Sequence, residues 1–102
     1  MRKKVDSYLG FAAKSRNLVS GYHTCLHAIK QKKLKLLILS EDLSENTQKK
    51  LSKLSTDNDV PLRVYGKMEE LSKVTGSRER GIFGITDVNF ADAIVKEIDG
   101  EF

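Results

Sequence analysis

The apolar residues of this chain recur with two different periods, and their alternation predicts helices that alternate with strands. Helical spacing of the i, i+3, i+4, i+7 kind first occurs over residues 5–14. It returns in a segment that opens at Ser20-Gly21, and then over residues 44–54, 68–75 and 90–98. The apolar positions of the first two predicted helices are Val5, Tyr8, Leu9 and Ala12, and then Tyr22, Cys25, Leu26 and Ile29.

Short apolar runs between these helices are typical of strands that are covered on both faces. They span residues 18–19, 34–39, 60–65 and 82–86. Local signals mark several helix ends: Ser44 is a predicted N-cap, Gly76 stands where a left-handed C-terminal residue belongs, and Asp87 or Asn89 caps the last helix.

Strands that alternate with helices at this spacing predict an α/β fold. We expect a three-layer α/β/α sandwich with a mainly parallel sheet of about four strands. A chain of 102 residues suffices for one compact core and is too short for two, so residues 1–102 are expected to form a single domain.

Composition excludes several classes of protein. Cys25 is the only cysteine, so the chain has no internal disulfide, and its position on an apolar helix stripe predicts a core residue. No apolar run approaches the ~20 residues of a membrane span, and the N-terminus lacks a signal-peptide block. The phosphate-loop, nucleophile-elbow and Cys-x-x-Cys motifs are absent from the sequence. We therefore expect a cytoplasmic, monomeric protein with no membrane partner, no catalytic activity, no cofactor and no metal.

The positive charge is concentrated in the N-terminal third. The whole chain carries +4, whereas residues 1–40 contain nine Lys or Arg against the single acid Asp6. Lys14, Arg16, Lys30, Lys32 and Lys33 belong to this group. Such asymmetry predicts one positively charged surface, and lysine-rich helix faces exposed to solvent are an equally good explanation.

The start of the second predicted helix has the features of a phosphate-binding site. Gly21 permits a close approach, and a helix N-terminus attracts anions through its unpaired N–H groups. His23, His27 and Lys30 follow on the polar face. The histidines alternatively have no role, or form part of a zinc site, for which a third ligand is missing.

A second candidate surface is the loop from Thr75 to Gly81, which follows a helix and precedes a strand. Arg78 and Arg80 lie in it between glycines, and arginines in such a loop bind phosphates or stack on bases. The alternative is an exposed connection with ordinary solubilising charge. The loop residues proposed for binding are Thr75, Gly76, Ser77, Arg78 and Arg80.

The order of these elements and several motifs resemble one known family. The matching segments are Leu18-Val19-Ser20-Gly21, Ala28-Ile29-Lys30, Leu36 to Thr47, Val60 to Gly66 and Thr86-Asp87. Of these, Ser40-Glu41-Asp42-Leu43-Ser44-Glu45-Asn46-Thr47 is the most specific. The chain thereby resembles the kink-turn RNA-binding ribosomal proteins of the L7Ae and L30e group, and within it the small bacterial YlxQ-type members.

The resemblance implies a binder of structured RNA, with a kink-turn or ribosomal RNA as partner and ribosomal particles as a further partner. The implied RNA contacts are Gly21, Tyr22, His23, Thr24 and His27, together with the Thr75–Gly81 loop for a flipped-out nucleotide. Lys14, Arg16 and Lys30 would add positive charge. Where family members typically have Asn, Glu and Lys, this chain has His23, Thr24 and His27. This difference supports an alternative function, a ribosome- or translation-associated protein-interaction module that has lost specific kink-turn recognition.

Overall fold

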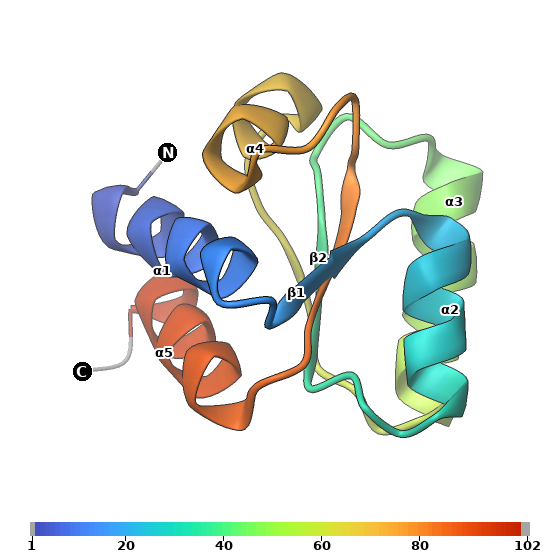
Figure 1. Cartoon of the computed structure of the whole chain (residues 1–102). Coiled ribbons are helices and arrows are strands. Elements are labelled where there is room, and N and C mark those ends of the chain that lie inside the picture. The colour runs from blue at the N-terminus through green and yellow to red at the C-terminus, as the bar shows by residue number, and fades with distance from the viewer. Residues whose placement is uncertain (1, 101–102) are drawn as a thin grey trace.

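The structure, a computed structural model, describes residues 2–100, and these form five helices around a four-stranded sheet (Figure 1). The helices are α1 (Lys3–Lys14), α2 (Tyr22–Lys30), α3 (Glu45–Asp57), α4 (Met68–Thr75) and α5 (Val88–Asp99). The strands are β1 (Leu18–Ser20), β2 (Leu36–Leu39), β3 (Leu62–Val64) and β4 (Ile82–Ile85). All four predicted strands are present, and their boundaries differ from the predicted ones by at most two residues.

The predicted three-layer arrangement is confirmed. Helices α1, α4 and α5 cover one face of the sheet, and α2 and α3 cover the other (Figure 1). Each helical layer packs against one face of the sheet and forms a separate apolar cluster with it. The clusters are separate because successive side chains of a strand point to opposite faces. Leu36 and Ile38 of β2 therefore pack towards α1 and α5, whereas Leu37 and Leu39 pack towards α2 and α3.

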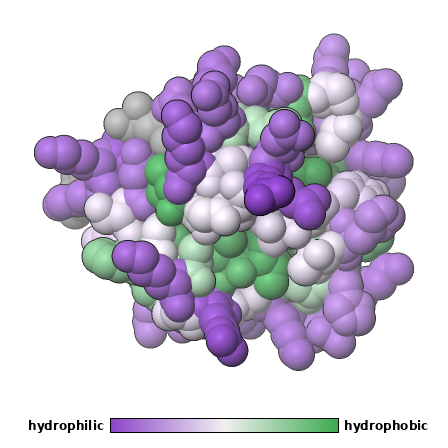
Figure 2. All heavy atoms as spheres, turned by 45° about the horizontal axis from the view of Figure 1, so that its top comes forward, coloured by the Kyte–Doolittle hydropathy of each residue, from purple (hydrophilic) through white to green (hydrophobic). Residues whose placement is uncertain are grey.

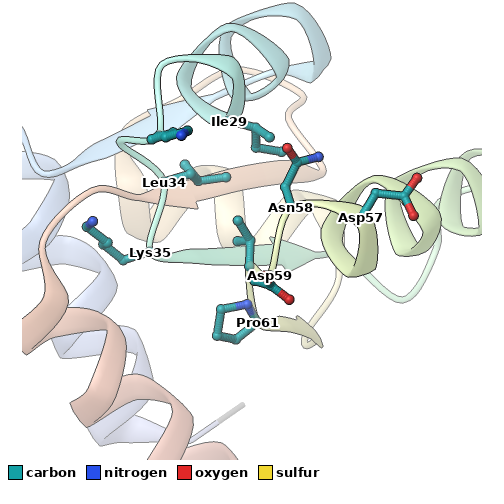
Figure 3. Close-up of a pocket in the computed structure, with 9 residues that line it drawn as sticks. Ile29, Leu34, Lys35, Asp57, Asn58, Asp59 and Pro61 are labelled. Atoms are coloured by element: carbon teal, nitrogen blue, oxygen red, sulfur yellow. The ribbon is translucent and has the colours of Figure 1, made fainter.

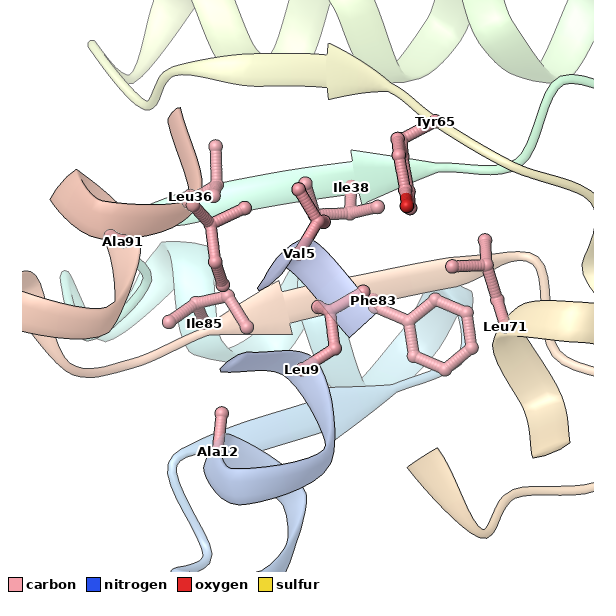
Figure 4. Close-up of a cluster of buried hydrophobic side chains, with 11 residues drawn as sticks. Val5, Leu9, Ala12, Leu36, Ile38, Tyr65, Leu71, Phe83, Ile85 and Ala91 are labelled. Atoms are coloured by element: carbon pink, nitrogen blue, oxygen red, sulfur yellow. The ribbon is translucent and has the colours of Figure 1, made fainter. Parts of the chain in front are cut away.

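The cluster beneath α1 is the larger of the two. Phe83 and Ile85 of β4 meet Val5 and Leu9 of α1 there, all fully buried (Figure 4). The apolar spacing of the first helix was therefore a correct guide to its buried face. In the second predicted helix, Cys25 and Ile29 are buried, but Tyr22 and Leu26 are only partly buried, and of these two Tyr22 packs against the other cluster.

The prediction of a mainly parallel sheet is wrong, because the sheet is mixed. The strand order is β1-β4-β2-β3; β4 is antiparallel to both its neighbours, and only β2 and β3 form a parallel pair. The cause lies in α4, which stays at the end of the sheet where β3 stops instead of running back along it (Figure 1). The chain therefore re-enters the sheet from the end it has just left, and β4 runs in the opposite direction.

Local signals marked helix ends correctly. Ser44 Oγ accepts a hydrogen bond from the Thr47 N–H at 3.2 Å, as expected of an N-cap. Asp87, rather than Asn89, caps α5, since its Oδ2 accepts from the Phe90 N–H at 2.9 Å. Gly76 adopts the left-handed conformation after α4, with φ 73°.

Candidate nucleic-acid interface

Three helices begin at one end of the sheet. Strands β1, β2 and β3 all run towards this end, and α2, α3 and α4 follow them. The loop from residue 76 to 81 lies at the same end, because Ile82 at the start of β4 pairs with Leu39 at the end of β2. Each helix N-terminus carries unpaired N–H groups and a partial positive charge. Within residues 2–100, Ser44 and Asp42 cap α3 and α4 with their side chains, whereas the start of α2 has no side-chain cap.

Gly21 forms the N-cap of α2 in a conformation that favours glycine, with φ 95° and ψ 154°. Its N–H donates to the Ile82 carbonyl at 2.8 Å and its carbonyl accepts from the Cys25 N–H at 3.0 Å, so the turn is tied to β4 and to the helix. No side chain of residues 2–100 caps this helix start. The first N–H groups of α2 are thus available to an external acceptor.

The side chain of Arg80 lies against Gly21. A Cβ atom on residue 21 would stand 3.2 Å from Arg80 Nη1 and 3.6 Å from its Cζ. The guanidinium group therefore occupies the space that the missing side chain leaves open. The two candidate surfaces predicted separately from the sequence, the helix start and the arginine loop, meet at this contact.

Ser72 of α4 holds the Arg80 backbone through two hydrogen bonds. Its Oγ accepts a hydrogen bond from the Arg80 N–H at 2.9 Å and donates to the Arg80 carbonyl at 3.1 Å. The Ser72 side chain is itself buried, so this contact is shielded from water. The backbone of Arg80 is thus held in place, whereas the residue as a whole is solvent-exposed.

Gly81 secures the other end of the loop. Its carbonyl accepts from the Ser40 N–H at 2.8 Å, and a Cβ at this position would lie 2.6 Å from Ser40 Oγ. Only glycine lets the loop pass so close to the end of β2. Nearer α4, Thr75 Oγ1 donates to the Leu71 carbonyl at 2.8 Å and lies 3.1 Å from the Ser77 hydroxyl, which can donate to it. The loop is therefore held at both ends, with Arg78 and Glu79 exposed between them.

His23, Thr24 and His27 lie on the exposed face of α2, in the two turns that follow Gly21. The Tyr22 ring meets the imidazole of His23 edge-to-face, with ring centroids 5.4 Å apart and planes at 86°. With this end of the molecule turned forward, hydrophilic side chains project around the face, and residues of intermediate hydropathy and hydrophobic residues lie between them (Figure 2). The site is therefore a rim of polar and charged groups rather than a deep cavity.

The remaining predicted residues are spread more widely. Lys14 lines a cleft of about 310 Å³ between α1 and α4, together with Thr75 and Gly76, and so adjoins the loop. Arg16 lies in the turn that precedes β1, at the other end of this strand from Gly21. Lys30 ends α2, about 12 Å along the helix axis from its first residue. The structure therefore brings Lys14 to the loop but leaves Arg16 and Lys30 outside the centre of the site.

The opposite end of the sheet has a different electrostatic character. Helices α2 and α3 end there, and a pocket of about 450 Å³ lies between their last turns and the following strands (Figure 3). Lys32 and Lys35 line it on one side, and Asp57 and Asp59 on the other. Helix C-termini carry partial negative charge, so this end is less suited to a polyanion.

Two groups near the site escaped the sequence analysis. Asp42 caps α4, since its Oδ1 accepts from the Met68 N–H at 3.0 Å. The Ser40 hydroxyl is the largest influence lowering the pKa of Asp42, followed by the Met68 amide. Within residues 2–100, this buried hydroxyl forms no hydrogen bond of normal geometry. Lys50 of α3 is the second group, with its Nζ 5.8 Å from the centroid of the Tyr22 ring. Neither contact has a signal in the sequence, because each joins residues far apart along the chain.

The placement of Cys25 agrees with its predicted role in the core. The residue is fully buried, and burial raises the pKa of its thiol to about 12. Within residues 2–100, no three His, Cys, Asp or Glu side chains are grouped so as to hold a metal ion. The same part of the chain contains no helix with the length and apolar character needed to span a membrane.

Comparison with known proteins relates nearly the whole chain to one family. The family described as "Ribosomal protein L7Ae/L30e/S12e/Gadd45 family" matches residues 3–95. A protein of Enterococcus faecium named RNA-binding protein YlxQ is 30% identical over 99 residues, covering 97% of this chain and 95% of that protein. A protein of the same name from Bacillus subtilis (strain 168) is 31% identical over 91 residues, covering 89% of this chain and 91% of the relative.

Solved structures resemble the fold closely. A protein of Bacillus halodurans C, described as having unknown function, superposes with a TM-score of 0.92 at 32% identity, covering 96% of this chain and 99% of the other. The 15.5kD RNA binding protein of Giardia lamblia superposes with a TM-score of 0.79 at 15% identity, covering 98% and 92% of the two chains. At that identity, the second likeness concerns the fold alone.

Proposed function

The chain belongs to the ribosomal protein L7Ae/L30e/S12e/Gadd45 family, and from this premise we propose that it is a non-catalytic binder of structured RNA. The proposed ligand is a kink-turn, in ribosomal RNA or another RNA. We further propose that the protein acts in the cytoplasm as a monomer and visits or belongs to ribosomal particles. The names of the two bacterial relatives support RNA as the ligand.

The contact between Arg80 and Gly21 is the observation that carries this proposal. It joins a helix start with free N–H groups to a loop that presents a cation from a backbone held by Ser72. A sharply bent RNA offers crowded phosphates next to an unstacked base, and these are the two groups that such a surface recognises. We assign the phosphates to the start of α2 and to Arg80, and the unstacked nucleotide to the loop, with Arg78 beside it.

Base recognition falls to the exposed side chains of α2. His23 and His27 offer ring N–H donors and, when neutral, one acceptor nitrogen each, and Thr24 offers a hydroxyl that both donates and accepts. These groups replace the Asn, Glu and Lys typical of the family. In this proposal they read the edges of the sheared G·A pairs beside the bend, while Lys14 contributes charge next to the loop.

The same replacements favour one second candidate. A protein-interaction module that has lost kink-turn specificity would keep the fold and would have no need of the family's Asn, Glu and Lys. The two functions differ in what they require of the RNA: only the first needs tandem G·A pairs.

An electrophoretic shift experiment separates the two candidates. The probe is a kink-turn RNA at about 150 mM salt, and the control is the same RNA with its G·A pairs replaced by Watson–Crick pairs. We expect selective binding by the wild type, a large loss in Arg80→Ala and a smaller loss in Arg78→Ala. Lys3→Ala, at the far end of α1, is the matched control and should bind as the wild type does. Equal affinity for both RNAs, or none for either, would overturn the proposal and favour the interaction module.

A further inference from the structure

The two helical layers differ in charge. Helices α2 and α3 together carry four lysines against two acids, and the turn after α2 adds Lys32, Lys33 and Lys35. Helices α1, α4 and α5 together carry five lysines against six acids. A polyanion that reaches the end of the sheet and extends past it therefore meets an attractive field over one layer only.

Most of the positive charge of α3 lies along its middle. Lys49, Lys50 and Lys53 follow one another there, whereas the acids Glu45 and Asp57 are its first and last residues. Lys49 Nζ is 3.6 Å from Glu45 and Lys53 Nζ is 3.4 Å from Asp57. Both pairs are more than half exposed, and pairs of this kind are weak in water, so the ammonium groups are free to turn to another anion.

Lys50 connects α3 to the site already described. Its ammonium lies over the ring of Tyr22, the first residue of α2, and that ring meets His23. A cation over an aromatic face is held in place without losing its charge. This contact therefore links the first residue of α2, at the proposed RNA site, to the middle of α3.

The surface beyond Lys50 is shaped for an extended polar ligand. A shallow hollow of about 540 Å³ is lined by Asn46, Thr47, Lys49, Lys50 and Lys53. Asn46 and Lys53 are seven residues apart, or about 10 Å along the helix axis. An amide group, a hydroxyl group and three ammonium groups thus line one hollow along α3.

We propose that a double-stranded arm of the bound RNA leaves the bend over α3, with its phosphates on Lys49, Lys50 and Lys53. The proposal rests on the proposed function, since the bend is held at α2 and the Arg80 loop. It adds a contact that depends on the phosphates and not on base sequence, as is usual for A-form duplexes. RNA that ends close to the bend would not reach this surface.

The test compares kink-turn RNAs with long arms and RNAs in which each arm in turn is cut to a few base pairs. The protein variant is Lys50→Gln/Lys53→Gln. The matched control is Lys3→Gln/Lys96→Gln, which removes the same charge from the other layer. Dissociation constants are measured by fluorescence anisotropy over a salt series.

We expect the Lys50→Gln/Lys53→Gln variant to lose about tenfold in affinity for the long-armed RNA, with the salt slope reduced by about two. Shortening one particular arm should remove this difference, and the control variant should match the wild type throughout. An unchanged affinity of the α3 variant for long-armed RNA, or an equal loss in the control variant, would overturn the inference. The proposed function would still stand in that case if the wild type binds selectively to RNA with the G·A pairs. If the wild type shows no such selectivity, both fail together.

Discussion

The guanidinium group of Arg80 occupies the space beside Gly21 that any other residue would fill with its own side chain. The two residues are 59 positions apart in the sequence, yet a Cβ on residue 21 would lie only 3.2 Å from Arg80 Nη1. This contact places the positive end of α2 beside a cation from the loop before β4.

We predict that Gly21→Ala damages both the fold and the site. The residue adopts φ 95° and ψ 154°, so an alanine there should lower the free energy of unfolding by about 1–3 kcal/mol. The added methyl group also displaces the Arg80 side chain, so affinity for kink-turn RNA should fall. Chemical denaturation and anisotropy titrations measure the two effects separately.

Gly100→Ala is the control for Gly21→Ala. Gly100 also has a positive φ, 73°, but a Cβ there meets no atom of the described residues within 4 Å. It should therefore cost some stability through strain without changing RNA affinity. If both variants lose affinity in proportion to their loss of stability, displacement of Arg80 is not the cause.

Ser72→Ala should uncouple the loop from α4. It removes both hydrogen bonds to the Arg80 backbone, which we expect to cost about 1 kcal/mol of stability. Affinity for kink-turn RNA should fall about tenfold, and the Arg80 amide should exchange with solvent faster than in the wild type. Ser7→Ala, on the exposed face of α1, is the control. Unchanged exchange at residue 80 would contradict the proposed role of Ser72.

RNA affinity should fall when both histidines of α2 are replaced. His23 and His27 are exposed on α2, and in the proposed function their ring N–H groups donate to the RNA. The His23→Gln/His27→Gln variant should therefore bind kink-turn RNA more weakly than the wild type. Unchanged affinity would show that neither histidine contacts the RNA and would leave the Arg80 contact unaffected.

Acid should weaken the fold through the pairing of Asp99 with Arg63. Arg63 donates two hydrogen bonds to the carboxylate, at 2.9 and 2.8 Å, and this lowers the pKa of Asp99. Because the folded-state pKa is the lower one, the pair stabilises the protein above the ordinary carboxyl pKa of about 3.9, and this contribution is lost as pH falls through the folded value. The thermal unfolding midpoint of Asp99→Asn should therefore depend less on pH below about 4 than that of the wild type. Asp92→Asn, on the exposed face of α5, should retain the wild-type dependence.

The thiol of Cys25 should be inert in the folded protein. Burial raises its pKa to about 12, so at pH 8 almost none is present as the reactive thiolate, and the side chain is fully buried. An aromatic disulfide reagent should react with the native protein only as fast as the protein unfolds, and at its full rate in denaturant. Because the folded-state pKa is raised, the thiol contributes stability below its ordinary pKa, and this contribution declines as pH rises above about 9. Rapid labelling of the native protein would contradict the burial of this residue.

Local patterns predicted the elements of this fold well because their causes are local. The spacing of Val5, Leu9 and Ala12 marked the buried face of α1, since residues three and four apart lie on one side of a helix. Ser44, Gly76 and Asp87 marked helix ends because a cap needs only a few neighbouring residues. The direction of β4 was not predictable in this way. A strand buried on both faces has the same apolar pattern whether its neighbours run parallel or antiparallel to it.

The sequence by itself therefore determined the order of helices and strands, most of the buried faces, the excess of positive charge and the residues proposed for binding. Only the tertiary structure decided which of those residues lie together. By inserting β4 between β1 and β2, it brought the loop that carries Arg80 onto Gly21, placed Ser72 beneath that loop and set Lys50 of α3 against Tyr22 of α2. The physical reason is that periodicity and capping depend on neighbours along the chain, whereas these contacts depend on the order and direction in which distant strands pair.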